Sequence, residues 1–350
     1  MADLRVAIIG YGLSGRVFHA PLIAATPGLT VTSVVTASPE RQAEVARDHP
    51  AARTLSSPDR LWERDDHDLV VLATPNDTHL PLATAAIDHG LPVVVDKPLA
   101  VTAARAEQLV GRAQSAGVLL TVFQNRRWDA DHLTLRRLLA GGHLGEVYRY
   151  ESRFERWRPV PKAGSWRETL APEQGGGLLL DLGSHLVDQA LTLFGPVTEV
   201  YAEVDARRGL AAEDDVFIAL RHVSGTISHL RASAVTAAPG PRLRVLGSEA
   251  GFVLTRMDSQ EDRLRAGERP DTVPDWGVEP EAHRGRLVTG DASVPVPGER
   301  GDWPQFYALL VAAVRDGGPP PVDPLDAVAA LHVLEHARSS AATRATISVA

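Results

Sequence analysis

The sequence predicts an α/β protein of two domains, in which a doubly wound parallel sheet is followed by an α+β domain. The chain has 350 residues, more than one hydrophobic core usually serves. Over its first 125 residues, apolar strand segments alternate with helical segments, as in βαβ units. Farther on, strand segments follow one another without helices between them, which is typical of antiparallel pairing. We therefore expect domains over residues 1–125 and 126–350, with the C-terminal helix as a candidate to pack back on the first.

The composition is that of a globular protein, with 44% hydrophobic and 23% charged residues. A net charge of −8 without any basic block argues against nucleic acid or anionic membranes as partners. No apolar run approaches the roughly 20 residues of a membrane helix, and the N-terminus lacks the features of a signal peptide. The absence of cysteine excludes disulfides and thiolate metal sites. We expect a cytoplasmic protein that acts on a small molecule.

The first strand runs directly into a glycine-rich turn. Leu4–Ile9 is apolar except for Arg5, which is typical of a strand buried on both faces of a parallel sheet. Gly10-Tyr11-Gly12-Leu13-Ser14-Gly15 follows, and residues 16–25 can form a helix. The three glycines permit a tight turn, close approach of a pyrophosphate, and close packing of helix on strand, while the helix N-terminus offers N–H groups to phosphates. The pattern predicts a Rossmann domain that binds a dinucleotide; a glycine-rich turn without a ligand is the alternative.

The alternation continues through the first domain. We expect strands over 30–36, 68–74, 91–96 and 118–123, and helices over 39–48, 79–89 and 102–116. Ligands of a doubly wound sheet bind beyond the carboxyl ends of its strands. The residues at those ends are therefore candidates to bind the cofactor: Gly10, Gly12, Leu13, Ser14, Gly15, Thr36, Ser38, Thr74, Pro75, Asn76, Lys97 and Asn125.

One of the two lysines of the chain lies at this edge. Of the 36 basic residues, only Lys97 and Lys162 are lysines, and all others are arginines. Lys97 follows the strand predicted over 91–96. Arginine keeps its proton at any workable pH, whereas a partly buried lysine can donate or accept a proton or stabilise an alkoxide. The position predicts a functional lysine; a chance surface lysine is the alternative.

The end of the second strand indicates which dinucleotide binds. A site for NAD usually places Asp or Glu there to hold the ribose 2′-hydroxyl. This chain instead has Thr36 and Ser38, followed by Arg41, and such hydroxyl and guanidinium groups suit a 2′-phosphate. We predict a preference for NADP over NAD, with these three residues near the phosphate. The alternatives are that Glu40 overturns this preference, or that the protein binds both NADP and NAD.

The second half is expected to be α+β. The sequence predicts a helix over 131–139 and strands over 147–157, 199–206, 216–223, 226–235 and 243–246. Residues 257–301 are rich in charge, proline and glycine, and we consider a lid, a partner arm or a mobile loop. Two helices, over 303–315 and 325–338, close the chain.

An apolar helix with a narrow polar stripe is predicted over 175–194. Asp181, Ser184, His185, Asp188 and Thr192 lie at spacings that place them on one helical face, and nearly everything else is apolar. Such a stripe on a buried helix indicates the lining of a cleft. Asp181 and His185, one turn apart, form a carboxylate–imidazole pair suited to proton transfer. A solvated or structural pair is the alternative, and two candidate ligands fall short of a metal site.

Four motifs together resemble the Gfo/Idh/MocA family of NAD(P)-dependent oxidoreductases, over nearly the whole chain. They are the glycine-rich turn 10–15, Ala73-Thr74-Pro75-Asn76 with His79, Asp96-Lys97-Pro98, and the helix over 176–188. The family usually has Glu-Lys-Pro, so Asp96 departs from it. Val17-Phe18-His19 and the stretch 123–129 resemble a subgroup near the scyllo-inositol dehydrogenases that use NADP.

The resemblance implies roles for particular residues. It implies a catalytic trio of Lys97, Asp181 and His185, and it adds His79 to the cofactor residues. As chemistry, His185 can take the hydroxyl proton of an alcohol, Lys97 can stabilise negative charge on the same oxygen, and Asp181 can orient the hydroxyl or the imidazole. The family fold also implies a large, mostly antiparallel open sheet in the second domain, which commonly mediates dimers or tetramers.

Substrate contacts are expected from the segment before the catalytic helix. Arg158 and Trp166, within a stretch that also holds Arg156, Trp157 and Arg167, suit a polyol or sugar pocket together with Asp181 and His185. Ordinary edge-strand chemistry is the alternative.

We expect an enzyme that transfers a hydride between NADP(H), or NAD(H), and a CH–OH group of a cyclic polyol, sugar or sugar derivative. Two alternatives remain from the sequence. One is a redox-neutral enzyme that processes glycosides with bound NAD, and the other is a non-catalytic regulator that senses a dinucleotide. Retention of Lys97 and His185 favours an enzyme over a regulator.

Overall fold

The computed structural model describes residues 2–162 and 164–349. They divide into two compact units. The first runs up to Asn125 and includes residues 259–276 and 302–328, and the second comprises 126–258, 277–301 and 329 onward. The predicted second domain over 126–350 is therefore not one continuous piece. Two of its segments belong to the first unit, where Trp303, Phe306 and Tyr307 are fully buried.

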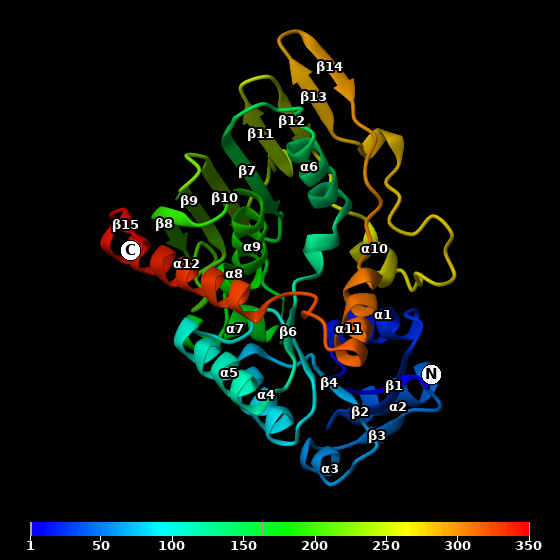
Figure 1. The fold of residues 1–350 in the computed structure, drawn as a ribbon. Helices are drawn as coiled ribbons and strands as arrows, with labels where there is room; N and C mark the ends of the chain where they lie inside the picture. The colour runs from blue at the N-terminus through cyan, green and yellow to red at the C-terminus, as the bar shows by residue number, and fades with distance from the viewer. Residues whose placement is uncertain (1, 163, 350) are drawn as a thin grey trace. The chain divides into compact units, whose positions relative to one another are not determined.

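The first unit contains a six-stranded parallel sheet in the order β3-β2-β1-β4-β5-β6 (Figure 1). The order reverses direction beside β1, as a doubly wound sheet requires, so the predicted fold class is confirmed. All residues of β4, β5 and β6 are buried, which explains why these strands are apolar except at Asp96 and Thr121. β3 was not predicted, because its three residues are at most half-buried and carry little pattern. The strands are β1 (Leu4–Ile9), β2 (Leu29–Val35), β3 (Arg53–Leu55), β4 (Leu69–Leu72), β5 (Val93–Asp96) and β6 (Leu120–Phe123).

Helices connect these strands. α4 and α5 contact each other, as do α1 and α11. The helix predicted over 16–25 begins earlier, and its first six residues form a π-helix, η1. The helices of the unit are η1 (Ser14–His19), α1 (Ala20–Ala24), α2 (Pro39–Asp48), α3 (Asp59–Trp62), η2 (Asn76–Thr78), α4 (His79–Asp88), α5 (Ala103–Ala116), α10 (Gln260–Arg265) and α11 (Pro304–Asp316).

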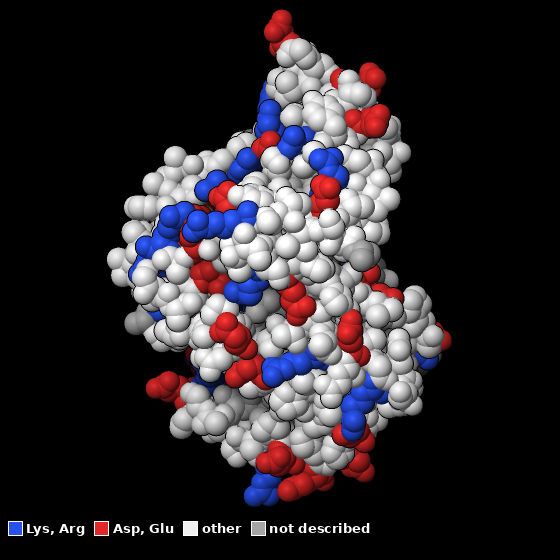
Figure 2. Space-filling view, turned by 90° about the vertical axis from the view of Figure 1, so that its left-hand side faces the viewer, with Lys and Arg blue, Asp and Glu red and all other residues white. Residues whose placement is uncertain are grey.

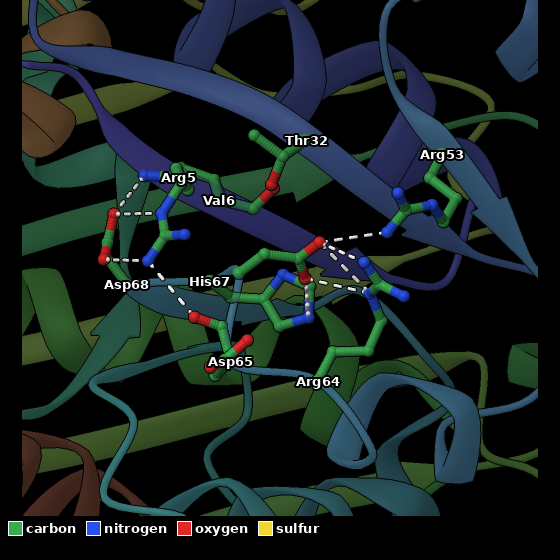
Figure 3. Close-up of polar contacts among 9 residues, drawn as sticks. Arg5, Val6, Thr32, Arg53, Arg64, Asp65, His67 and Asp68 are labelled. Carbon is green, nitrogen blue, oxygen red and sulfur yellow. Dashed lines mark hydrogen bonds and ion pairs between the residues drawn. The ribbon is translucent and has the colours of Figure 1, made fainter.

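Ion pairs lie at the amino ends of the strands of this sheet (Figure 3). Asp68, just before β4, accepts hydrogen bonds from the backbone N–H and the guanidinium of Arg5 on β1. The carboxylate of Asp66 pairs with the guanidinium groups of Arg53 and Arg64. Charge is thus neutralised at the edge opposite the glycine-rich turn.

The second unit contains a nine-stranded sheet in the order β14-β13-β12-β11-β7-β10-β9-β8-β15. It is mostly antiparallel, as expected, but β7 and β10 pair in parallel. Four strands were not predicted, and two of them form a hairpin inside the segment 257–301 (Figure 1). Part of that segment is therefore sheet. The strands are β7 (Val147–Glu155), β8 (Val197–Asp205), β9 (Asp215–His222), β10 (Ile227–Ser233), β11 (Leu243–Gly247), β12 (Gly251–Leu254), β13 (Arg286–Thr289), β14 (Ala292–Pro295) and β15 (Ile347–Ser348).

The two faces of this sheet differ in chemistry. Tyr150, Ser152 and Phe154 of β7 are buried, and β7 and β10 contact helix α9. The alternate residues of β7 carry charge and pair across the strands, as in Arg244–Glu151 and Arg231–Glu155. Figure 2 shows basic and acidic side chains side by side on the side of the molecule where β8 to β10 lie in Figure 1. One face of the sheet is therefore core and the other is polar.

The predicted helix over 175–194 begins only at Leu178 and is divided in two. Gly175 and Gly177 have φ of +88° and +93°, which are not helical. A Cβ at Gly177 would lie 2.3 Å from the carboxylate carbon of Glu213, so this turn needs glycine. None of the helices described is long and apolar enough to cross a membrane. The remaining helices are η3 (Asn125–Trp128), α6 (Ala130–Ala140), α7 (Trp166–Thr169), η4 (Pro172–Gln174), α8 (Leu178–Asp181), α9 (Gly183–Phe194), η5 (Glu281–His283) and α12 (Pro324–Thr343).

Candidate active site

The glycine-rich turn of the first unit fits a bound pyrophosphate. Gly10 has a φ of +99°, and a Cβ there would lie 2.4 Å from the carbonyl oxygen of Ala73. A Cβ at Gly15 would lie 2.1 Å from the carbonyl oxygen of Gly10. At Gly12, by contrast, no described atom lies within 4 Å of where a Cβ would be. The fold therefore needs Gly10 and Gly15, whereas the space beside Gly12 is left for a ligand. Leu13 is exposed next to it.

The residues predicted to contact a 2′-phosphate lie at the start of α2. Ser38 caps this helix, because its Oγ accepts the N–H of Arg41 at 3.4 Å. Thr36 is buried, and its carbonyl accepts the side-chain amide of Gln42 at 2.9 Å. The side chain of Arg41 is exposed and has no hydrogen bond or ion pair within the described part of the chain. The first turn of α2 thus presents one uncompensated cation beside a helix N-terminus.

His79 ties two loops of the cofactor edge together. Its Nδ1 lies 2.8 Å from the carbonyl oxygen of Pro98, and its Nε2 lies 3.1 Å from that of Thr74. The ring is fully buried, and this burial lowers the pKa of the imidazole. In the same loop, Thr78 Oγ donates to Pro75 O at 2.7 Å, and Asn76 is buried. Both ring nitrogens of His79 thus lie next to backbone carbonyls, and its predicted contact with the cofactor stays a prediction. Asn125, at the end of β6, is also buried.

Lys97 follows β5 directly and is half-buried. Its backbone N–H donates to Asp96 Oδ1 at 2.8 Å, and the peptide bond to Pro98 is cis. Asp96 is almost fully buried. Burial opposes its charge, but contacts with His19, Lys97 and Ser14 outweigh burial and lower the pKa of the carboxyl. The carboxylate beside the lysine is therefore ionised.

Asp181, at the end of α8 in the second unit, is joined to the predicted substrate segment. Its Oδ1 accepts from Arg167 Nε at 3.2 Å. The guanidinium of Arg167 lies over the ring of Trp166, 4.4 Å from its centre. The structure thus brings Trp166 and Asp181 together through Arg167. The side chain of Arg158 is exposed, and its backbone carbonyl accepts a hydrogen bond from Arg208.

His185 lies on α9, one helical turn after Asp181. It packs against an aromatic ring that two arginines also contact. The ring of Phe154 contacts the imidazole edge-on, with 6.4 Å between the ring centres. Arg126 and Arg242 lie over Phe154, at 4.9 Å and 4.2 Å from its centre. His185 is 5% exposed. The side chains around His185 thus come from β7, from η3 and from the residue that precedes β11.

Buried charged residues form hydrogen bonds with side chains of α9. Arg127 binds Asp188 through two hydrogen bonds, of 2.9 and 2.6 Å. Arg242 pairs with Asp131 at 3.0 Å and donates to the side chain of Gln189 at 2.9 Å. Asp188 belongs to the predicted polar stripe, but its carboxylate is directed at Arg127. The sequence analysis did not predict that Arg127 would pair with Asp188. The polar stripe indicated that the buried Asp188 needs a partner, but spacing along the chain does not identify it.

His132 lies on α6, near the arginines of this network. It is expected to make the stability of the folded protein sensitive to acid. Burial, with the nearby charges of Arg136, Arg127 and Arg242, lowers its pKa to about 3. Below its unfolded pKa of about 6.5, the unfolded chain binds a proton that the folded chain does not. Stability is therefore expected to fall as pH falls, by up to about 1.4 kcal/mol per pH unit from this group. Urea unfolding between pH 7 and 5 measures the slope.

His132→Asn is expected to reduce that slope, whereas the exposed His143→Asn should keep that of the wild type. Equal slopes in all three proteins would contradict the assignment.

The predicted catalytic residues come from both units. Lys97 belongs to the first, and Asp181 and His185 belong to the second. Within the described residues, no group of three or more His, Asp or Glu side chains is placed to hold a metal.

A glycine-rich turn on a doubly wound sheet, followed by a second unit with a large mixed sheet, is typical of a nucleotide-binding domain joined to a second domain. Two family models match the chain. One, described as an oxidoreductase family with an NAD-binding Rossmann fold, matches residues 4–124, and the other, the GFO/IDH/MocA C-terminal domain, matches residues 132–253. The chain belongs to the Gfo/Idh/MocA family of oxidoreductases.

Relatives of full length support this assignment. The oxidoreductase YdgJ of Escherichia coli is 40% identical over 99% of both chains. The scyllo-inositol 2-dehydrogenase (NADP⁺) IolW of Bacillus subtilis is 34% identical, over 98% of this chain and 95% of its own. The solved structure of YPO2259 from Yersinia pestis is 37% identical, with a TM-score of 0.91 over 100% of this chain and 98% of the other.

Proposed function

We propose that this oxidoreductase transfers a hydride between NADP(H) and a CH–OH group of a cyclic polyol, a sugar or a sugar derivative. The observation that carries the proposal is the open space beside Gly12, on the sheet edge that also bears Lys97. The family is an NAD-binding one, and one relative is named as a dehydrogenase of scyllo-inositol that uses NADP⁺.

The side chains have distinct roles in this proposal. His185 accepts the proton of the substrate hydroxyl, because an imidazole can change its charge near neutral pH. Lys97 donates a hydrogen bond to the same oxygen and stabilises its negative charge. Asp181, held by Arg167, orients the hydroxyl, and Trp166 and Arg158 contribute to the substrate pocket. The nicotinamide, when bound, exchanges a hydride with the carbinol carbon.

Absorbance at 340 nm tests this function. Purified protein is incubated with NADP⁺ or NAD⁺ and a panel of inositols, aldoses and sugar alcohols. Reduction of NADP⁺ with a cyclic polyol or sugar is the expected result. Binding of a dinucleotide without reduction on any member of the panel would favour the redox-neutral enzyme or the sensing regulator instead.

Arg41 is expected to set the preference for NADP(H). Its exposed side chain near the cap of α2 can pair with a 2′-phosphate, and a hydrogen bond to a charged group contributes about 1.5–3 kcal/mol. We expect Arg41→Ala to raise the Kd of NADPH about 10-fold or more and to change that of NADH little. Fluorescence titration of both cofactors measures this.

Arg105→Ala, which removes an arginine from the first turn of α5, serves as the control and should change neither Kd. Equal weakening of NADPH and NADH by Arg41→Ala would contradict a role at the 2′-phosphate.

We also propose that the protein acts in the cytoplasm as a homodimer or homotetramer through the sheet of the second unit. The polar face of that sheet carries charges that are neutralised within one copy, as in Arg231–Glu155 and Arg244–Glu151, so a second copy can pack on it without unpaired charge. Light scattering coupled to size-exclusion chromatography gives the mass in solution, and a monomer at micromolar concentration would contradict the proposal.

A further inference from the structure

Ser14 is directed at Asp96, although it lies in the glycine-rich turn. Its Oγ–H donates to Asp96 Oδ2 at 2.5 Å, and only 8% of the residue is exposed. The other carboxylate oxygen, Oδ1, accepts the backbone N–H of Lys97 at 2.8 Å. A single buried carboxylate therefore connects the phosphate-binding turn with the lysine of the site.

His19 lies beside this carboxylate, and Tyr307 is hydrogen-bonded to His19. His19 Nε2 lies 3.9 Å from Asp96 Oδ2, and His19 Nδ1 lies 2.6 Å from the hydroxyl of Tyr307. Burial raises the pKa of Tyr307 well above its usual value, so its hydroxyl keeps the proton and can donate to Nδ1. The other ring nitrogen of His19, Nε2, lies on the side of Asp96. All four residues are buried.

His19 belongs to the Val17-Phe18-His19 motif, to which the proposed function assigns no role. The contacts of His19 with Asp96 and Tyr307 suggest a structural role for this motif. η1 has π-helical winding and carries both Ser14 and His19, so two side chains of one short helix face the same carboxylate. A buried carboxylate needs hydrogen-bond donors to remain ionised, and here the hydroxyl of Ser14 and the backbone N–H of Lys97 supply them, with the imidazole of His19 3.9 Å away.

We propose that Ser14 is a positioning residue that acts on Lys97 through Asp96, rather than a residue that binds the cofactor. The inference rests on the proposed role of Lys97. Asp96, His19 and Tyr307 form the rest of the positioning chain.

Kinetics of Ser14→Ala separate the two roles of the serine. If it positions Lys97, kcat is expected to fall about 10-fold, since a hydrogen bond to a charged group is lost. The Kd of NADPH should remain within about 2-fold, because the cofactor loses no contact. A rise of about 10-fold in Kd with unchanged kcat would overturn the proposal.

Ser33→Ala is the matched control. Ser33 lies in β2, is 1% exposed, and its hydroxyl has no hydrogen-bond partner among the described residues. The same loss of a buried hydroxyl should there change neither kcat nor Kd. Tyr307→Phe is the second variant, for the case that Ser14→Ala does not fold; it should lower kcat in the same direction without touching the glycine-rich turn.

A measurement on the protein without cofactor tests the positioning independently of turnover. Protein grown with ¹⁵N-lysine gives two lysine amide signals, from Lys97 and Lys162, because the chain has no other lysine. Both N–H groups donate to carboxylates, to Asp96 at 2.8 Å and to Glu168 at 3.0 Å. Ser14→Ala is expected to shift the Lys97 signal and to leave the Lys162 signal in place.

An unmoved Lys97 signal would overturn the inference even if the enzyme is active. Conversely, a shifted signal in a protein that reduces neither NADP⁺ nor NAD⁺ would leave the positioning chain in place and remove only the proposed function.

Discussion

Lys97→Met and His185→Ala are each expected to lower kcat by at least about 100-fold. Loss of a general base costs about 10²–10⁴ in rate, and loss of a group that stabilises an oxyanion costs about 10²–10³. Methionine matches the length of lysine but neither donates a hydrogen bond nor carries charge. Neither change alters the glycine-rich turn, so the Kd of NADPH should stay nearly constant. Initial rates at 340 nm and fluorescence titration of NADPH measure the two quantities.

The chain offers matched controls for both substitutions. Lys162→Met removes the only other lysine, whose side chain is exposed, and His143→Ala removes an exposed histidine. Both variants should retain kcat. Near-normal turnover of Lys97→Met or His185→Ala would remove that residue from the proposed mechanism, whereas a large loss in the controls would show that the effect is not specific to the site.

Asp188→Ala is expected to lower the free energy of unfolding by about 3–5 kcal/mol, the usual effect of removing one partner of a buried ion pair. The Asp188 side chain is 2% exposed and that of Arg127 is 15% exposed, so the arginine would be left buried and uncompensated. Both hydrogen bonds between them would also be lost. Urea unfolding followed by tryptophan fluorescence gives the change in midpoint.

Two comparisons identify the cause of this loss. The double variant Arg127→Leu with Asp188→Leu removes both charges and should lose much less stability, since no unpaired charge remains. Glu199→Ala breaks the exposed pair with Arg221, in which the side chains are 51% and 47% exposed, and should cost less than about 1 kcal/mol. An equally small effect of Asp188→Ala would mean that water reaches Arg127.

Much of the first unit followed from local pattern. A strand buried on both faces is mostly apolar, and such apolar runs identified β1, β4, β5 and β6 along the chain. The short β3 was missed, because three half-exposed residues carry no such signal. The same limit applies to β13 and β14, whose residues are mostly exposed and lie in a segment rich in charge.

The helix with the polar stripe shows what the local sequence pattern could not predict. Its spacing correctly placed Asp181, His185 and Asp188 on helical segments, but the glycines at 175 and 177 delayed its start and Leu182 divided it. The need for Gly177 comes from Glu213, a residue far along the chain. Spacing alone therefore gave the residue types and not their partners.

The sequence by itself determined the doubly wound sheet, the glycine-rich turn and the position of Lys97 at the edge of that sheet, because strand period and glycine geometry are properties of neighbouring residues. Only the tertiary structure decided that residues 259–276 and 302–328 belong to the first unit, that Ser14 faces Asp96, and that Arg127 neutralises Asp188. Those pairs are separated by 82 and 61 residues. Contacts over such distances depend on how whole elements pack, which no local period encodes.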